Sequence, residues 1–277
     1  MALHRLAFIT RKSFMSNFAD YKNAFQTIKL ERTDSGILQM TLHTNGGPWV
    51  WDARAQPDGR AGVSHQELAD AAAMIARDIE NRVVIITGTG DHFSGPPASR
   101  NTMSRGDVKH WDRVQFLGNH TLMDLLDIPG PVISCLNGPA YRHAEIPFIA
   151  DIVLAADDAF IQDSAHFPNR VVPGDGIGVL FPHLMGSNRG RYFHLTSQKI
   201  AAPELKTMSL VNEVMARERL LPRAWEHAEE LIKNNPYTLR YTRLLLTAPL
   251  KALLRQHLHY GHAMEALAAV DESARKT

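Results

Sequence analysis

The chain has 277 residues, of which 44% are hydrophobic and 21% are charged, a composition typical of a globular protein with one large core. Thirty basic residues and 29 acidic residues leave a formal charge of +1, so no overall field would attract nucleic acid or an anionic membrane. No apolar run approaches the roughly 20 residues that span a bilayer. We therefore expect a soluble, cytoplasmic protein that acts on a small neutral molecule.

The two ends of the chain differ from its middle. The first fourteen residues contain three basic side chains and no acidic one, as transit peptides do, but Met15 is an alternative natural start. We predict a disordered extension over residues 1–20, a core over residues 21–215 and a helical region over residues 216–277.

Four apolar runs rich in β-branched residues predict strands, at residues 37–43, 83–87, 132–136 and 152–155. The first three runs are separated by stretches long enough for crossover helices, which indicates an α/β fold. The single cysteine, Cys135, lies inside the third run, so we expect a small buried thiol rather than a nucleophile.

Helices are predicted between the strands and at the C-terminal end. Ser64 is placed to cap a helix that Glu67 would close as a capping box, and a second helix covers Trp111–Leu126. The remaining helices are expected at residues 218–233, 236–247 and 249–270. Their apolar faces require packing on the core or on a partner subunit.

Side chains that can transfer protons gather in the middle third of the chain. They are His143, Glu145, His166 and Asp175, the last of which lies in the turn-rich loop over residues 167–176. A histidine can take a proton from water at neutral pH, and a carboxylate beside it stabilises the imidazolium that forms. The same spacing is compatible with a hydrogen-bonded core histidine and with a turn aspartate that bonds its own backbone.

Other chemistries lack their motifs. The sequence has no His-Glu-x-x-His, no cysteine pair and no acidic calcium loop, so we expect no metal. Gly88-Thr89-Gly90 follows a strand without the lysine of a phosphate loop, so a tight turn is the better interpretation and we expect no cofactor. Ser164 is not surrounded by the Gly-x-Ser-x-Gly elbow of a serine nucleophile.

The chain resembles the crotonase superfamily from about Tyr21 to Asp271, in segments at residues 83–90, 131–139 and 151–156. Further segments are similar to the 6-oxocamphor hydrolase type of β-diketone hydrolase, at residues 143–147, 166–168, 172–176 and 186–193. The resemblance implies a crotonase-like spiral of ββα units, followed by a C-terminal helical oligomerisation region.

Departures from the acyl-CoA crotonases favour the narrower resemblance. Those enzymes carry a glycine run after the Asn-Gly turn, whereas here the chain continues through Pro139, Tyr141 and Arg142 to His143. Glu145 matches one catalytic glutamate of the hydratases. The second catalytic glutamate of the hydratases has no match, because Ser164 and Ala165 lie in that part of the sequence.

The resemblance assigns roles to individual residues. It implies that His166 is the base that activates water, that Asp175 orients His166 and that His143 lies near a substrate carbonyl or its oxyanion. Trp51 and Glu265 match residues that contact the substrate carbonyls. His65 matches a further active-site histidine. The stretch over residues 52–63 departs from the family pattern, because it is longer than the family's connection there.

The implied activity is a cofactor-independent, retro-Claisen hydrolysis of a 1,3-diketone to a keto acid. The implied assembly is a homotrimer or a pair of trimers. Two alternatives stay open, an enoyl-CoA hydratase or isomerase of the same fold and a non-catalytic scaffold that binds partners through its C-terminal helices. The sequence does not identify the natural diketone.

Overall fold

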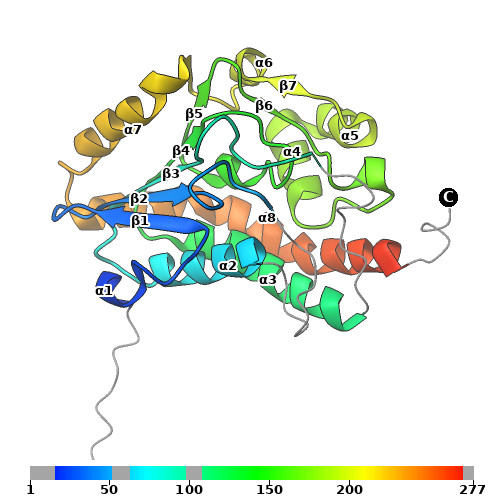
Figure 1. The fold of residues 1–277 in the computed structure, drawn as a ribbon, viewed down its shortest axis with the longest axis horizontal. Helices are drawn as coiled ribbons and strands as arrows, with labels where there is room; N and C mark the ends of the chain where they lie inside the picture. Colours follow the sequence, from blue (N-terminus) through cyan, green and yellow to red (C-terminus); the bar gives the residue numbers. More distant parts are fainter. Residues whose placement is uncertain (1–15, 52–62, 98–107, 271–277) are drawn as a thin grey trace, which may run out of the picture.

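The computed structural model describes residues 16–51, 63–97 and 108–270 (Figure 1). Its main sheet has six strands in the order β1-β2-β3-β4-β5-β8. β1 and β2 form an antiparallel hairpin, and every later neighbour pairs in parallel. The strands are β1 (Ile28–Arg32), β2 (Ile37–Leu42), β3 (Val83–Thr87), β4 (Val132–Leu136), β5 (Ile152–Ala156) and β8 (Glu213–Met215).

A small antiparallel pair and the helices complete the fold. β6 (Phe160–Ile161) pairs with β7 (Ile200–Ala201). The α-helices are α1 (Phe18–Tyr21), α2 (Val63–Ala76), α3 (Val108–Asp127), α4 (Ile177–Met185), α5 (Ser187–Thr196), α6 (Ala202–Thr207), α7 (Arg217–Leu231) and α8 (Pro236–Val270), and the 3₁₀ turns are η1 (Ile146–Ile149) and η2 (Phe167–Asn169).

Both faces of the sheet are covered, which explains the continuous apolar runs in its strands. Successive side chains point to opposite faces, so Val84 and Ile86 join the larger core cluster, to which α2, α3, α4 and α8 contribute. Val83 and Ile85 join the smaller cluster, with side chains of α7. In Figure 1, α7 accordingly lies on one side of the sheet, and α2 and α3 lie on the other.

A buried arginine fixes α8 against the body. Arg243 is 2% exposed, and its Nε lies 2.6 Å from Asp151 Oδ2. Its Nη1 donates to the carbonyl of Leu126, at the end of α3, over 2.8 Å. Asp151 also accepts from the backbone N–H of Val132 over 2.7 Å, so the arginine ties α8 to α3 and β4. The far end of α8 is thereby held in place for the site described below.

The α/β class and the predicted strands are confirmed, with β3 and β4 at their predicted bounds. Cys135 is buried, and burial raises the pKa of its thiol to about 12. Helix α1 spans the predicted boundary after residue 20, and its last residue, Tyr21, is buried. Among the described helices, none combines the length and the apolar character needed to cross a bilayer.

Two local predictions are wrong. Ser64 lies inside α2 rather than at its cap, and the carboxylate of Glu67 instead accepts from the backbone N–H groups of Gln26 and Thr27, each over 2.7 Å. The helices expected on either side of Pro249 form one helix, α8. Proline removes the hydrogen bond to the carbonyl four residues earlier, and that residue, Leu245, is 74% exposed in the single chain, so the lost bond lies outside the protein core.

Candidate active site

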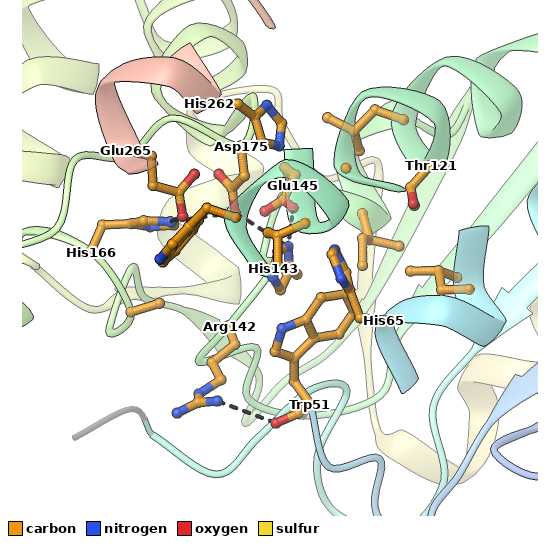
Figure 2. A pocket seen from close by; sticks show the side chains of 17 residues that line it. Trp51, His65, Thr121, Arg142, His143, Glu145, His166, Asp175, His262 and Glu265 are labelled. Carbon is orange, nitrogen blue, oxygen red and sulfur yellow. Dashed lines mark hydrogen bonds and ion pairs between the residues drawn. The ribbon is translucent and has the colours of Figure 1, made fainter. Parts of the chain in front are cut away.

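One pocket gathers all six residues to which the resemblance assigns roles, together with Glu145 (Figure 2). Because parallel strands end at the same edge of a sheet, the segments that follow them meet there. Trp51 follows β2 and His143 follows β4, two strands of the main sheet, whereas His166 and Asp175 follow β6, which pairs antiparallel with β7 in the separate two-stranded sheet. Helix α2 contributes His65 to the pocket, and α8 contributes Glu265. The structure thus places these residues together, and their catalytic roles stay predictions.

His143 lies between two carboxylates. Its Nδ1 is 2.7 Å from Glu145 Oε1 and 3.3 Å from Asp175 Oδ2, and its ring packs on Trp51 with 3.7 Å between the centroids. Burial alone would lower the pKa of His143, but the neighbouring charges of Glu145 and Asp175 raise it overall. Its φ of 48° is in the left-handed region, which is unusual for a residue with a side chain and typical of functional sites.

His166 is held at both ring nitrogens. Its Nδ1 is 2.8 Å from Asp163 Oδ1, while its Nε2 faces Asp175 Oδ2 at 3.4 Å and Glu265 Oε1 at 3.6 Å. Burial opposes its positive form, but the charges of Asp163 and Asp175 and their hydrogen bonds raise the pKa of His166 well above the ordinary value. The carboxylates around the ring therefore favour the imidazolium form of His166.

The placement of Asp175 differs from its predicted role. Asp175 does pair with His166, but at the ring nitrogen that faces the pocket, and it also reaches His143. The carboxylate behind His166 is Asp163, which sequence reasoning missed. The available signal was its position three residues before His166, where a turn returns the carboxylate to the ring. The charges of the surrounding histidines outweigh burial and lower the pKa of Asp175.

His65 stays neutral. Its ring centroid lies 5.0 Å from that of Trp51 and 6.4 Å from that of His143. Burial lowers the pKa of His65 to about 3, with nearby imidazoles adding to the effect. His65 can therefore offer a neutral hydrogen bond to a ligand but cannot carry positive charge near neutral pH.

Polar bonds fix the loop that carries His143. The Ser94 hydroxyl donates to the carbonyl of Arg142, and Arg142 Nη1 donates to the carbonyl of Trp51 over 3.2 Å. Arg142, the residue before His143, is thus bonded to both the Ser94 and the Trp51 segments. These bonds hold the strained backbone of His143 in place.

Glycines bring Asp175 and α8 together. A Cβ on Gly174 would lie 2.1 Å from the carbonyl oxygen of Gly261, and a Cβ on Gly261 would lie 2.4 Å from that of Gly174. On the other side of α8, a Cβ on Gly118 would lie 2.3 Å from His262 Nε2. At Gly174 and Gly261 the close atoms belong to the backbone, so only glycine permits this approach, which brings the loop carrying Asp175 against the helix carrying Glu265.

Several pocket residues in the described part of the chain have a buried polar atom with no hydrogen-bond partner. Such atoms are rare inside proteins, and here they border a pocket that a ligand can fill. His262 illustrates the arrangement, because its Nδ1 bonds the Leu258 carbonyl over 3.1 Å and its Nε2 remains unpaired. The unpaired atoms are His65 Nδ1, Trp111 Nε1, Glu145 Oε2, His262 Nε2 and Glu265 Oε2.

One grouping in the described residues has side chains that suit a metal ion. Ligand atoms of His143, Glu145 and Asp175 lie within 4.8 Å of one another. The same atoms already form hydrogen bonds and ion pairs, because one proton on His143 Nδ1 serves both carboxylates. The carboxyl of Glu145 is further stabilised in its neutral form, since burial raises its pKa. We interpret the grouping as a proton-sharing cluster.

The comparisons with known proteins point in two directions. Residues 63–275 match the enoyl-CoA hydratase/isomerase family model. A probable enoyl-CoA hydratase of Mycobacterium tuberculosis is 30% identical over 220 residues, covering 73% of this chain and 70% of that protein. A putative enoyl-CoA hydratase/isomerase of Bacillus subtilis is 27% identical over 191 residues, covering 67% of this chain and 73% of that protein.

Among the similar solved structures, one is named as a β-diketone hydrolase rather than as an enoyl-CoA hydratase. A β-diketone hydrolase from the cyanobacterium Anabaena sp. PCC 7120, bound to (S)-3-oxocyclohexyl acetic acid, is 37% identical, with a TM-score of 0.84, and covers 92% of this chain and 98% of its own. An enoyl-CoA hydratase/isomerase from Mycobacterium paratuberculosis is 21% identical, with a TM-score of 0.76 and coverage of 90% and 96%, which shows the fold alone. The resemblance predicted from the sequence is confirmed: the chain belongs to the enoyl-CoA hydratase/isomerase family and has the crotonase fold.

Proposed function

We propose that this protein is a cofactor-independent hydrolase that cleaves a carbon–carbon bond of a 1,3-diketone. The observation that carries the proposal is the convergence of two imidazoles, His143 and His166, on the carboxylate of Asp175 inside one buried pocket. A diketone needs a base for water and donors for its oxygens, and this arrangement supplies both. The 37% identity with the β-diketone hydrolase over most of the chain supports the same reaction class.

In the first step, the neutral form of His166 takes a proton from water at Nε2, and the hydroxide adds to one carbonyl carbon. The tetrahedral adduct collapses to a carboxylic acid by breaking the bond to the carbon between the two carbonyls. The electron pair of that bond passes into an enolate on the second carbonyl. The enolate carbon then takes a proton from the His166 imidazolium. A cyclic diketone whose ring contains the broken bond and water thus give one keto acid, and a linear diketone and water give a carboxylic acid and a ketone.

His143 is placed to stabilise the developing negative charge. Its Nδ1 is occupied by Glu145 and Asp175, and Nε2 is the other donor of the ring. The raised pKa of His143 favours a charged ring, which binds an oxyanion more strongly than a neutral donor does. The unpaired atoms of His65 and Trp111 provide further contacts for substrate oxygens.

The second candidate is an enoyl-CoA hydratase. It is favoured by the buried Glu145, because burial raises the pKa of its carboxyl, and by the names of the sequence relatives. A hydratase of the two-glutamate type needs a second acid, and Ser164 and Ala165 occupy that neighbourhood. We therefore rank hydration second.

A substrate panel tests the proposal. The protein is incubated with cyclic and linear 1,3-diketones and with crotonyl-CoA, without coenzyme and with EDTA present. We expect loss of diketone ultraviolet absorbance together with acid release, and no change with crotonyl-CoA. Hydration of crotonyl-CoA without acid release from any diketone would replace this function with the second candidate.

Replacing the proposed base tests the assignment of His166. His166→Ala is expected to lower kcat by about two to four orders of magnitude, the usual contribution of general acid–base catalysis. The matched control is His227→Ala, which removes a histidine bonded to a carboxylate, Glu213, at 2.9 Å, far from the pocket. Near-normal turnover of a correctly folded His166→Ala variant would remove His166 from the mechanism.

A further inference from the structure

A second carboxylate and imidazole lie behind His166, on the side away from the pocket. Asp163 Oδ1 accepts from the backbone N–H of His166 over 3.2 Å and faces its Nδ1 at 2.8 Å. The other oxygen, Asp163 Oδ2, is 2.9 Å from His194 Nδ1. Asp163 is 1% exposed, His166 3% and His194 6%, so water does not replace these contacts. Among the seventeen pocket-lining residues, neither Asp163 nor His194 appears.

The ring of His194 is fixed from three sides. Its Nε2 is 3.1 Å from the carbonyl oxygen of Ile177, at the start of α4. Aromatic rings enclose it, with centroid distances of 6.3 Å to Phe181 and 5.1 Å to Phe193. A carbonyl only accepts hydrogen bonds, so Nε2 carries a hydrogen. The contact between Nδ1 and Asp163 Oδ2 is a further hydrogen bond, which ties the ring to the carboxylate.

The Asp163 carboxyl is stabilised as an anion despite its burial. Burial alone would raise its pKa, but the charge and hydrogen bond of His166 and the bonds of His194 lower it. One buried anion therefore interacts with two imidazole rings, only one of which faces the pocket. A carboxylate bonded at Nδ1 fixes the tautomer of a histidine and leaves its Nε2 free for proton transfer.

We propose that Asp163 and His194 are a positioning pair that orients His166 and limits how strongly its positive form is favoured. Asp163 holds the hydrogen on His166 Nδ1, so that Nε2 is presented to the pocket. His194 shares the negative charge of Asp163 from the opposite oxygen. This proposal deepens the proposed function and rests on it for its effect on turnover.

The charges around His166 explain why such sharing matters. Asp163, Asp175 and Glu265 all face the ring, and on the pocket side the imidazole of His143 shares the Asp175 carboxylate with it. Carboxylates on both sides favour the imidazolium, which cannot accept a proton from water. A hydrogen-bond donor on the buried side of Asp163 weakens that preference without entering the pocket.

The deciding variant is His194→Phe. Phenylalanine retains the ring packing against Phe181 and Phe193 but removes both hydrogen bonds of His194. The histidine-ring signals of His166 are followed by NMR against pH, with assignment by His166→Gln. We expect the His166 titration to move to higher pH, because Asp163 then acts on His166 alone. His194→Gln, which restores a donor at a similar position, is expected to give a smaller shift.

Asp163→Asn provides the complementary test. The neutral amide removes the charge behind His166, so its titration is expected to move to lower pH. The amide also permits the wrong tautomer, so kcat for the diketone should fall about 10²- to 10⁴-fold, the range seen when the orienting group of a catalytic histidine is lost. His227→Gln serves as the control and should change neither quantity.

The two readouts separate the positioning pair from the proposed reaction. If no diketone is cleaved by the wild-type protein but the His166 titration shifts as described, the pair is supported and the proposed function is wrong. If the folded His194→Phe and Asp163→Asn variants titrate at His166 like the wild-type protein, the pair does not act on His166 and the proposal is overturned. Equal losses of melting temperature and activity without a shift in the titration also overturn it.

Discussion

The protonation state of His166 controls the chemistry at the scale of single residues. Three carboxylates face its ring, and the charges and hydrogen bonds of two of them, Asp163 and Asp175, raise its pKa well above the ordinary value of 6.5 despite burial. A general base must be unprotonated to accept a proton from water. The active fraction of the enzyme is therefore small at low pH and increases as pH rises through the pKa of His166.

The expected pH dependence follows with a definite sign. The value of kcat/KM for a diketone should rise with pH, and its acid limb should have a midpoint above 6.5, the ordinary histidine value. The limb of the free enzyme is read from kcat/KM measured across a buffer series. A rate that is already maximal below pH 6 would contradict the requirement for neutral His166.

At the scale of secondary-structure elements, the position of α8 relative to the loop before α4 determines the distance between the carboxylates. Gly174 and Gly261 allow backbone contact at this crossing, next to Asp175 on one side and Glu265 on the other. Arg243 fixes the same helix near its other end through Asp151. Misplacing catalytic groups by about 1 Å costs roughly 100-fold in rate, so this crossing bears directly on turnover.

Gly261→Ala should therefore impair activity. The new Cβ would lie 2.4 Å from the carbonyl oxygen of Gly174, so the helix and the loop must separate. We expect kcat/KM to fall by about 100-fold, with a destabilisation of roughly 1–3 kcal/mol, as for other overpacked sites. Gly47→Ala is the control, because its Cβ would meet its nearest neighbour, the Thr44 carbonyl oxygen, at an ordinary 3.6 Å. Equal activity of both variants would show that the crossing tolerates displacement.

At the scale of the whole molecule, the first half of α8 exposes an apolar face. Tyr237 is 60% exposed, Tyr241 61%, Leu244 42% and Leu245 74%. These residues recur at three- and four-residue spacing, so they lie on one side of the helix. An exposed apolar stripe of this kind marks an interaction surface. We propose that a second copy of the chain covers it within a homotrimer or a pair of trimers.

The double variant Tyr241→Asp with Leu245→Asp tests this assembly. Burying two carboxylates in an apolar interface is unfavourable, so light scattering should show a shift from an oligomer towards the 30.9 kDa monomer. The control is Lys206→Asp on the polar surface of α6, which should remain oligomeric. A wild-type protein that is monomeric at all concentrations would refute the proposed assembly.

Local patterns predicted much of the fold because the signals are strong. The buried strands at Val83–Thr87 and Val132–Leu136 are continuous apolar runs, and both were placed at their observed bounds. Pro249 predicts a break between two helices, which is wrong, because the effect of a proline depends on whether the freed carbonyl, here that of Leu245, lies in the core. Glu67 misled because its partner, Thr27, lies 40 residues away, and local spacing carries no information about such a contact.

The sequence predicts which residues form the candidate site but not which atoms contact each other. The family resemblance predicts that His143, His166 and Asp175 share one site, and the structure places them in one pocket. Which ring nitrogen each carboxylate faces depends on the path of the loop between β6 and α4, which spacing cannot define. Asp163 and His194 come together over 31 residues without any motif that marks them. The loop over residues 52–63, apart from its last residue, lies outside the described residues.

The most direct test of the account is the fate of water oxygen. A 1,3-diketone is incubated with the protein in ¹⁸O-labelled water, without coenzyme, and the products of the wild-type protein and His166→Ala are quantified by mass spectrometry. With a cyclic 1,3-diketone, we expect a keto acid with one ¹⁸O in its new carboxyl group, beyond the exchange seen in a protein-free control, and loss of this product in the variant. Absence of keto acid with the wild-type protein, together with hydration of crotonyl-CoA, would contradict it.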